Sequence, residues 1–110
     1  MLSWEDFEKV DIRVGTIIEA RPFLEARRPA YQLWIDFGPE LGHKKSSAQI
    51  TDLYPMEALV GRQVVAVVNF PPKQIAHFMS ECLVLGVVGQ AEGVVLLRPD
   101  QPVENGHRIG

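Results

Sequence analysis

Two apolar runs flank a short proline-rich corner in the second half of the chain, and neither run alternates. Val64–Val68 is entirely apolar, and Cys82–Val88 contains only apolar residues and one glycine. A strand with one face in water alternates apolar and polar residues, so these runs predict strands that are covered on both faces. A chain of 110 residues has little material for a second cover. The pattern therefore predicts a small β-protein that pairs with a partner and carries its site at the corner.

Composition limits the class of protein. The length fits one domain over residues 1–110, and an apolar fraction of 46% is enough for a core. No apolar run approaches the ~20 residues of a membrane helix, and the N-terminus lacks the features of a signal peptide. The single cysteine, Cys82, suits the cytosol. We therefore expect a cytoplasmic protein without membrane insertion, and the net charge of −3 disfavours a general nucleic-acid binder while leaving a local basic patch open.

The order of the expected elements predicts the fold. Ser3 is a helix N-cap, Gly15 indicates a bulge or bend, and a proline–glycine pair brackets a second helix. The expected elements are a helix to about Lys9, strands over 10–18, 31–37, 43–50, 64–68, 82–88 and 94–97, a helix over 55–61 and a turn over 89–93. This order predicts an all-β, five-stranded OB-fold barrel with a short N-terminal helix and a helix between strands 3 and 4.

Catalytic and metal chemistry have weak support. Cys82 and His77 are the only thiol–imidazole pair close in sequence, and the apolar run around Cys82 raises a thiol pKa instead of activating it. The three histidines are widely spaced, and the chain has no CxxC, HExxH, GxxxxGK[ST] or GxGxxG motif. We expect no catalytic residue, no metal site and no cofactor.

Polar and aromatic residues around the corner favour a binding groove. An unstacked base or an extended peptide needs aromatic faces and polar side chains to hold it. The hydroxyls, amide, ammonium and carboxylate come from Ser46, Ser47, Asn69, Lys73, Ser80 and Glu81, and the aromatic faces come from Phe70 and Phe78. Core packing of the two phenylalanines and a simple strand-start turn at Ser80 and Glu81 remain open alternatives. OB-fold barrels bind on the face of strands 2 and 3, which here includes Gln32, Trp34, Lys45, Ser47 and Gln49.

Six segments in series resemble a known family from about Phe7 to Ile109. The chain is similar to the bacterial tRNA-binding-domain proteins of the EMAP II type, and within them to a chaperone-like branch associated with secretion. The matching segments are Val10–Gly15, Ser46–Ile50, Gly61–Val65, Asn69–Lys73, Ser80–Glu81 and Arg98–Asp100.

The resemblance implies a function and a set of groove residues. It implies an OB-fold homodimer built from terminal segments and barrel strands, tRNA binding in the wider family, and, in the chaperone-like branch, binding of unfolded or export-bound polypeptides and of the Sec ATPase. The matching groove positions are Ser46, Ser47, Gln49, Asn69, Phe70, Lys73, Phe78, Ser80 and Glu81.

Two binding functions follow as alternatives. The first is a non-enzymatic, homodimeric chaperone-like protein that binds polypeptides in protein export. The second is a tRNA-binding protein in which basic residues contact phosphates while Asn69, Ser80 and Glu81 contact a protruding base. The phosphate-contact candidates are Arg27, Arg28, Lys44 and Lys45, together with Lys73, and a solvated loop is the simpler interpretation of each basic pair.

Overall fold

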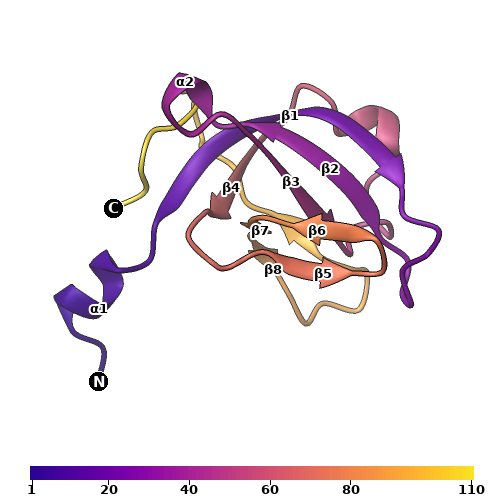
Figure 1. Cartoon of the computed structure of the whole chain (residues 1–110), viewed down its shortest axis with the longest axis horizontal. Helices are drawn as coiled ribbons and strands as arrows, with labels where there is room; N and C mark the ends of the chain where they lie inside the picture. Colours follow the sequence, from indigo (N-terminus) through magenta and orange to yellow (C-terminus); the bar gives the residue numbers. More distant parts are fainter.

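Five antiparallel strands wrap into a nearly closed, OB-like barrel, as predicted (Figure 1). The computed structural model describes all 110 residues. The elements are α1 (Trp4–Glu8), β1 (Ile12–Pro22), β2 (Tyr31–Asp36), α2 (Gly38–Leu41), β3 (His43–Ala48), η1 (Met56–Ala58), β4 (Gln63–Val67), β5 (Lys73–Ile75), β6 (Phe78–Ser80), β7 (Leu83–Val84), β8 (Gly86–Val87) and β9 (Val95–Leu96). The barrel strands follow the order β3-β2-β1-β4-β7, and β5-β6 and β8-β9 form two separate hairpins.

The N-terminal helix forms where its cap predicts. The Ser3 hydroxyl accepts a hydrogen bond from the Asp6 backbone N–H at 3.0 Å, and two acids lie in the first turn. The helix buries none of its residues and stands off the barrel (Figure 1). The α-helices have five and four residues, and no helix has the length and apolar character that a bilayer crossing requires.

The helix expected between strands 3 and 4 is present only as the single 3₁₀ turn η1. Pro55 is its N-cap, and Gly61 adopts a φ of 91° shortly after its last residue. The segment between the proline and the left-handed glycine is short, so it forms too few helical hydrogen bonds to offset the free energy of helix nucleation. Leu59 still anchors the turn, because its side chain is fully buried in the barrel.

The long strand β1 bends at a different place from the one predicted. Its pairing with β2 shifts register between Ile17 and Glu19, whereas the sequence placed a bulge or bend at Gly15. Gly15 serves close packing instead: a Cβ there would lie 2.6 Å from a methyl carbon of Ile35 and 2.7 Å from the ring of Phe37. A glycine at this point lets two core side chains contact the backbone of β1.

A second apolar cluster lies outside the main core. The barrel interior holds the larger cluster, and its fully buried members include Ile17, Leu33, Ile35, Phe37 and Leu59. The smaller cluster consists of Phe23, Ala30 and Phe78, with Trp34 and Ile75 against it. Trp34 alternates with the core residues of β2 and therefore points outward. The β5–β6 hairpin thus covers part of the outer face of β2 and β3.

The two Val-rich runs behave differently. Every residue of Val64–Val68 is buried within the single chain, because β4 lies between β1 and β7. The second run is not one covered strand. It divides into β7 and β8, and Leu83 is 49% exposed and Val87 is also exposed. The turn predicted over 89–93 does form, between β8 and β9.

Candidate functional site

Side chains close the barrel where β3 meets the segment after β6. The backbone N–H of Glu81 donates to the Lys45 carbonyl at 2.8 Å, and the Lys45 N–H donates back to the Glu81 carboxylate at 3.0 Å. The Ser47 N–H donates to the Ser80 hydroxyl at 3.0 Å, and the Ser46 hydroxyl donates to the Cys82 carbonyl at 2.9 Å. We call this set of bonds between Lys45–Ser47 and Ser80–Cys82 the seam.

The seam uses three of the expected groove residues for structure. Ser46 is fully buried, so its hydroxyl does not reach solvent. The hydroxyl of Ser80 and the carboxylate of Glu81 each satisfy a backbone N–H of β3 that would otherwise lack a partner. These side chains stand in for the backbone groups of a regular ladder, which explains their residue types without a ligand.

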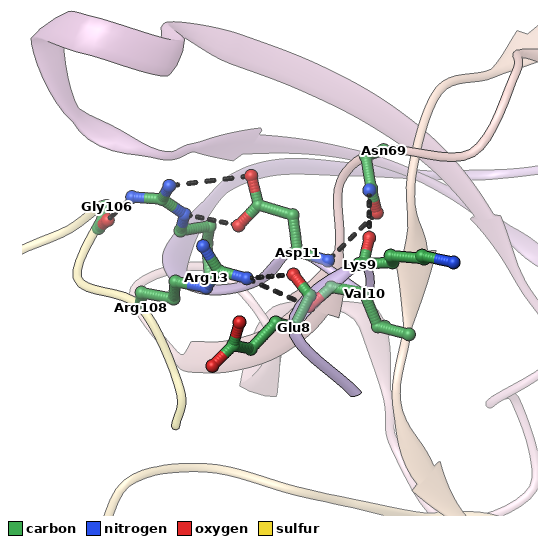
Figure 2. A network of polar contacts seen from close by, with 8 residues as sticks. All are labelled: Glu8, Lys9, Val10, Asp11, Arg13, Asn69, Gly106 and Arg108. Carbon is green, nitrogen blue, oxygen red and sulfur yellow. Dashed lines mark hydrogen bonds and ion pairs between the residues drawn. The ribbon is translucent and has the colours of Figure 1, made fainter. Parts of the chain in front are cut away.

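Asn69 is engaged by backbone groups on either side of the junction between α1 and β1. Figure 2 shows its amide between the ends of α1 and β1: the Nδ2 donates to the Lys9 carbonyl at 2.7 Å, and the Oδ1 accepts from the Asp11 N–H at 3.0 Å. The Arg108 guanidinium donates to the Glu8 carbonyl at 2.6 Å in the same view. Asn69 and Arg108 therefore hold α1 to the barrel.

An ion pair sits beside this attachment. The Arg13 Nε donates to the Asp11 carboxylate at 2.6 Å, and a second nitrogen donates to the Gly106 carbonyl at 3.0 Å (Figure 2). The hydrogen bond to Asp11 raises the pKa of Arg13 above its ordinary value. Through Arg13, this pair links the start of β1 to Gly106 in the C-terminal segment. The family-like segment Val10–Gly15, which contains the pair, therefore contributes to the stability of the fold.

Phe78 is buried in the smaller cluster, and its ring faces other side chains. Its ring makes edge contacts with Phe23 and Trp34, at centroid distances of 5.4 Å and 5.9 Å. The Lys45 ammonium lies 5.1 Å from the centroid of the same ring, and the Arg21 guanidinium lies 4.9 Å from that of Trp34. Two cation–π contacts, Lys45 with Phe78 and Arg21 with Trp34, thus position the two cations on this face. The spacing of these residues in the sequence did not indicate either contact.

Five of the expected site residues line one open cleft of about 530 Å³. We call it the basic cleft. Its polar lining includes Arg27, Arg28, Ser47, Gln49 and Lys73. The chain has four ion pairs, and none of them includes a basic residue of this cleft. Three free cations and one lining acid, Glu25, give the cleft a positive balance in a protein whose net charge is negative.

A smaller and mostly apolar slot of about 270 Å³ adjoins the corner. It is lined by Phe70, Pro71, Lys73, Ser80, Cys82 and Leu83. Phe70 is 55% exposed, so its ring is free to contact a ligand. Lys73 lines both the slot and the basic cleft and therefore connects them. Lys44 lines neither of them; it pairs with Ile35 across β2 and β3.

The hairpin tip contributes residues that sequence reasoning missed. Gln74, Ile75 and Ala76 line the basic cleft. Ala76 has a φ of 52°, and it is the only residue other than glycine with a positive φ. Such a backbone costs an alanine ~1 kcal/mol or more. In the sequence, only the pair Pro71-Pro72 indicated a sharp turn near this hairpin. The two turn residues, Ala76 and His77, are not an Asn-Gly pair or another common two-residue turn sequence.

The single thiol is unsuited to nucleophilic chemistry. Burial raises the pKa of Cys82 to about 12. A thiol with this pKa stays protonated at neutral pH, and the thiolate is the reactive form. The structure also brings together no group of three or more histidine, cysteine, aspartate or glutamate side chains that could hold a metal ion.

The chain matches a known protein family over most of its length. Residues 12–108 match the family described as "Putative tRNA binding domain". The methionine–tRNA ligase of Nitrosomonas eutropha is 35% identical over 108 residues, which are 98% of this chain and 15% of that protein. That of Thiobacillus denitrificans is 36% identical over 114 aligned residues, covering 98% of this chain and 16% of that protein. The chain thus spans only about one-sixth of the length of these relatives.

Two solved structures match along the whole chain. The chaperone CsaA of Bacillus anthracis is 56% identical with a TM-score of 0.94, and the match covers 100% of this chain and 99% of that one. The CsaA chaperone protein of Picrophilus torridus is 53% identical with a TM-score of 0.94, and the match covers both chains completely. The chain therefore belongs to the tRNA-binding-domain family, as the resemblance predicted, and within it is similar over its full length to the CsaA chaperones.

Proposed function

We propose that this chain is a non-enzymatic, homodimeric binding protein with a chaperone-like role in export, which binds unfolded or export-bound polypeptides. The observation that carries the proposal is the apolar slot beside the basic cleft, with the half-exposed Phe70 ring at its wall. An unfolded polypeptide offers apolar side chains to such a slot. The full-length similarity to proteins named as CsaA chaperones supports the same function.

The slot and the cleft together suit an extended chain. Lys73 belongs to both, so a ligand that crosses it contacts apolar surface on one side and free cations on the other. Ser47 and Gln49 add hydrogen-bonding groups along the cleft. An apolar residue in the slot, followed by polar or acidic residues in the cleft, satisfies both surfaces.

The second candidate is tRNA, and the free cations of the cleft favour it. Arg27, Arg28 and Lys73 have no acidic partner within the chain, and phosphates are strong acceptors for such groups. An unpaired base in the slot would stack on Phe70, and base–aromatic stacking contributes ~1–3 kcal/mol per base. The family assignment supports this ligand.

The proposed homodimer contact lies on the outer face of the barrel near β8. Val87 pairs with Val95 across β8 and β9, and Val87, Val88 and Leu97 are exposed apolar side chains of this region. The α1 arm adds Trp4, which is 86% exposed. A soluble monomer rarely leaves so many large apolar groups in water on neighbouring elements. We propose that a second copy covers them.

The proposed partners also indicate where in the cell the protein acts. Both ligands, and the Sec ATPase that the resemblance adds as a partner, are found in the cytoplasm. A dimer would carry two grooves, so a long polypeptide or a folded tRNA that spans both would gain avidity. We therefore propose a cytoplasmic protein that acts on long ligands.

Salt dependence separates the two ligands. The affinities for tRNA and for an unfolded preprotein are measured at two salt concentrations, with the wild type, Phe70→Ala, Lys73→Gln and the distant control Lys9→Gln. Polypeptide binding should change little with salt and fall in Phe70→Ala. Phosphate-driven binding should weaken steeply with salt and fall in Lys73→Gln.

Each ligand has its own contradicting result. A preprotein affinity that is unchanged in Phe70→Ala contradicts the polypeptide function of the slot. A tRNA affinity that is flat with salt contradicts the phosphate contacts of the cleft. Lys9→Gln removes one charge from α1, so a loss in this variant shows a general charge effect.

A further inference from the structure

A second polar cleft, of about 290 Å³, is lined by two arginines and by no residue of the basic cleft or the apolar slot. Arg62 enters it from the turn before β4, and Arg98 from the segment after β9. Each belongs to a segment through which the sequence resembles its family, and neither segment contributes to the basic cleft or the apolar slot. The proposed function therefore does not explain why both arginines line this cleft.

Tyr54 fixes the two walls of this cleft relative to each other. The Arg62 guanidinium lies 5.1 Å from the centroid of the Tyr54 ring. The Tyr54 hydroxyl accepts a hydrogen bond from the Leu96 N–H at 2.9 Å, two residues before Arg98. The Tyr54 carbonyl accepts a hydrogen bond from the Tyr31 hydroxyl at 2.7 Å. The Tyr54 side chain thus contacts the first arginine and bonds to the strand β9, which directly precedes the segment that carries the second.

Gln63 holds the far side of the same cleft. Its Nε2 donates to the Val103 carbonyl at 2.6 Å, and its Oε1 accepts from the Val103 N–H at 3.1 Å. This pair of bonds fastens the chain after Arg98 against the start of β4. The backbone of Arg62 is fixed as well, because its carbonyl accepts from the Ile17 N–H at 3.0 Å. The cleft is a built feature of the fold.

Both guanidiniums lack partners in the chain. Neither takes part in any of the four ion pairs, and the Arg62 Nε is buried without a hydrogen-bond partner. Arg13 and Arg108, in contrast, each donate to oxygens of the chain. A buried donor without an acceptor is costly, and a half-buried guanidinium on an aromatic ring is well placed to bind an anion.

We propose that the Arg62–Arg98 cleft is an oxyanion site that takes a single phosphate group. The planar donors of two arginines match the oxygens of a phosphate. The site opens to solvent, so free phosphate and a phosphate of an RNA backbone satisfy the same chemistry. Asp100 also lines the cleft, and its carboxylate repels an anion. Asp100 should therefore lower the affinity of the site for phosphate. Removing its charge should raise this affinity, whereas removing either arginine should lower it.

Inorganic phosphate is the first probe, in a buffer without other oxyanions. Binding is measured by titration calorimetry with the wild type, Arg98→Gln, Arg62→Met and Asp100→Asn. Each arginine variant should lower the affinity about tenfold, the loss of charge-assisted hydrogen bonds. Asp100→Asn should raise it. Arg62→Met keeps an apolar stem on Tyr54, and Arg98→Gln changes an exposed residue, so at least one folded variant is available.

A second probe, a short single-stranded RNA, distinguishes the sources. If the site takes backbone phosphates, the plot of log affinity against log salt should be less steep in Arg98→Gln, with a slope smaller in magnitude by ~0.7. If it takes free phosphate only, the slope stays that of the wild type while phosphate binding is lost. Lys9→Gln, outside both clefts, should leave phosphate binding unchanged. The groove is measured independently through preprotein binding by Phe70→Ala, so the oxyanion site and the proposed function fail separately.

Three results overturn the proposal. The first is a wild type that binds no phosphate and has an RNA slope equal to that of Arg98→Gln. The second is phosphate binding that is unchanged in Arg98→Gln and Arg62→Met but lost in the charge control Lys9→Gln. The third is a dimer structure in which a carboxylate of the second copy occupies the two guanidiniums.

Discussion

Glu81 bonds to Lys45 twice, once through its backbone N–H and once through its carboxylate, and so closes the barrel between β3 and β6. Glu81→Ala removes the carboxylate and leaves the Lys45 N–H without an acceptor. The free energy of unfolding should fall by ~1–3 kcal/mol, the cost of an unmet, charge-assisted bond. Urea denaturation of this variant measures the loss.

The matched control is Glu92→Ala, in the exposed turn between β8 and β9. It removes the same charge from a position without a hydrogen bond in the seam, and its stability should match the wild type. Equal stabilities of Glu81→Ala and Glu92→Ala would show that the carboxylate does not contribute to closure.

Asn69→Ala should loosen α1 without unfolding the barrel. The substitution removes both bonds that join Lys9 and Asp11 to the end of β4. Hydrogen exchange at the backbone N–H groups of Phe7 and Val10, which are bonded within this segment, should become faster. Exchange in β1 and β2 should be unchanged.

The same variant tests the base-contact role that the sequence assigned to Asn69. In the structure both ends of its amide are occupied by backbone groups. We expect tRNA binding to change only as far as α1 contributes to the dimer. A large loss of tRNA affinity with unchanged exchange in α1 would restore the direct contact.

The stability of the protein should fall in alkaline solution through Cys82. Burial raises the pKa of its thiol from 9.0 to about 12, so the folded state keeps a proton that the unfolded state loses. The free energy of unfolding then decreases as the pH rises from about 9 toward 12. Urea titrations across this range, compared with Cys82→Ala, isolate the contribution of the thiol.

Alkylation at pH 8 gives a second measurement on Cys82. The native thiol should react slowly, at a rate that follows opening of the fold, because it is buried and protonated. Fast alkylation of the folded protein would contradict the burial of this thiol.

A charge on the outer face should dissociate the dimer. Val87 is 43% exposed and pairs with Val95 on β9, so Val87→Lys places an ammonium in the proposed contact. Light scattering at micromolar protein should give a dimer mass for the wild type and a monomer mass for this variant. Val60→Lys is the control, since Val60 is 55% exposed beside η1 and outside this face. A monomeric wild type, or loss of the dimer in both variants, contradicts the assignment.

The sequence was informative wherever a single strand or cap carried its own signal. The alternation of Tyr31–Phe37 predicted β2, and Ser3 predicted the start of α1. The hairpin of β5 and β6 was missed because its turn residue, Ala76, has a left-handed backbone that alanine rarely adopts. Phe78, which follows this turn, is buried in the smaller apolar cluster, and this packing offsets part of the strain at Ala76.

Polar residues have two uses in a small barrel, and the sequence does not distinguish them. Ser47, Gln49 and Lys73 line an open cleft, and their role as ligand contacts stays a prediction. Glu81 and Asn69 have the same polarity in the sequence, yet they replace missing backbone bonds at the seam and at α1. Spacing along the chain cannot separate these uses, since the difference lies in which backbone groups remain unpaired after folding.

Lys73 and Ser80 are directly paired across the β5–β6 hairpin. One residue faces the proposed ligand, and the other accepts the bond that closes the barrel. The two-strand ribbon therefore places the ligand-facing cation directly opposite the residue that closes the barrel. We expect a change that opens the seam at Ser80 to displace Lys73 as well, so closure of the barrel and the geometry of the binding surface are coupled through one residue pair.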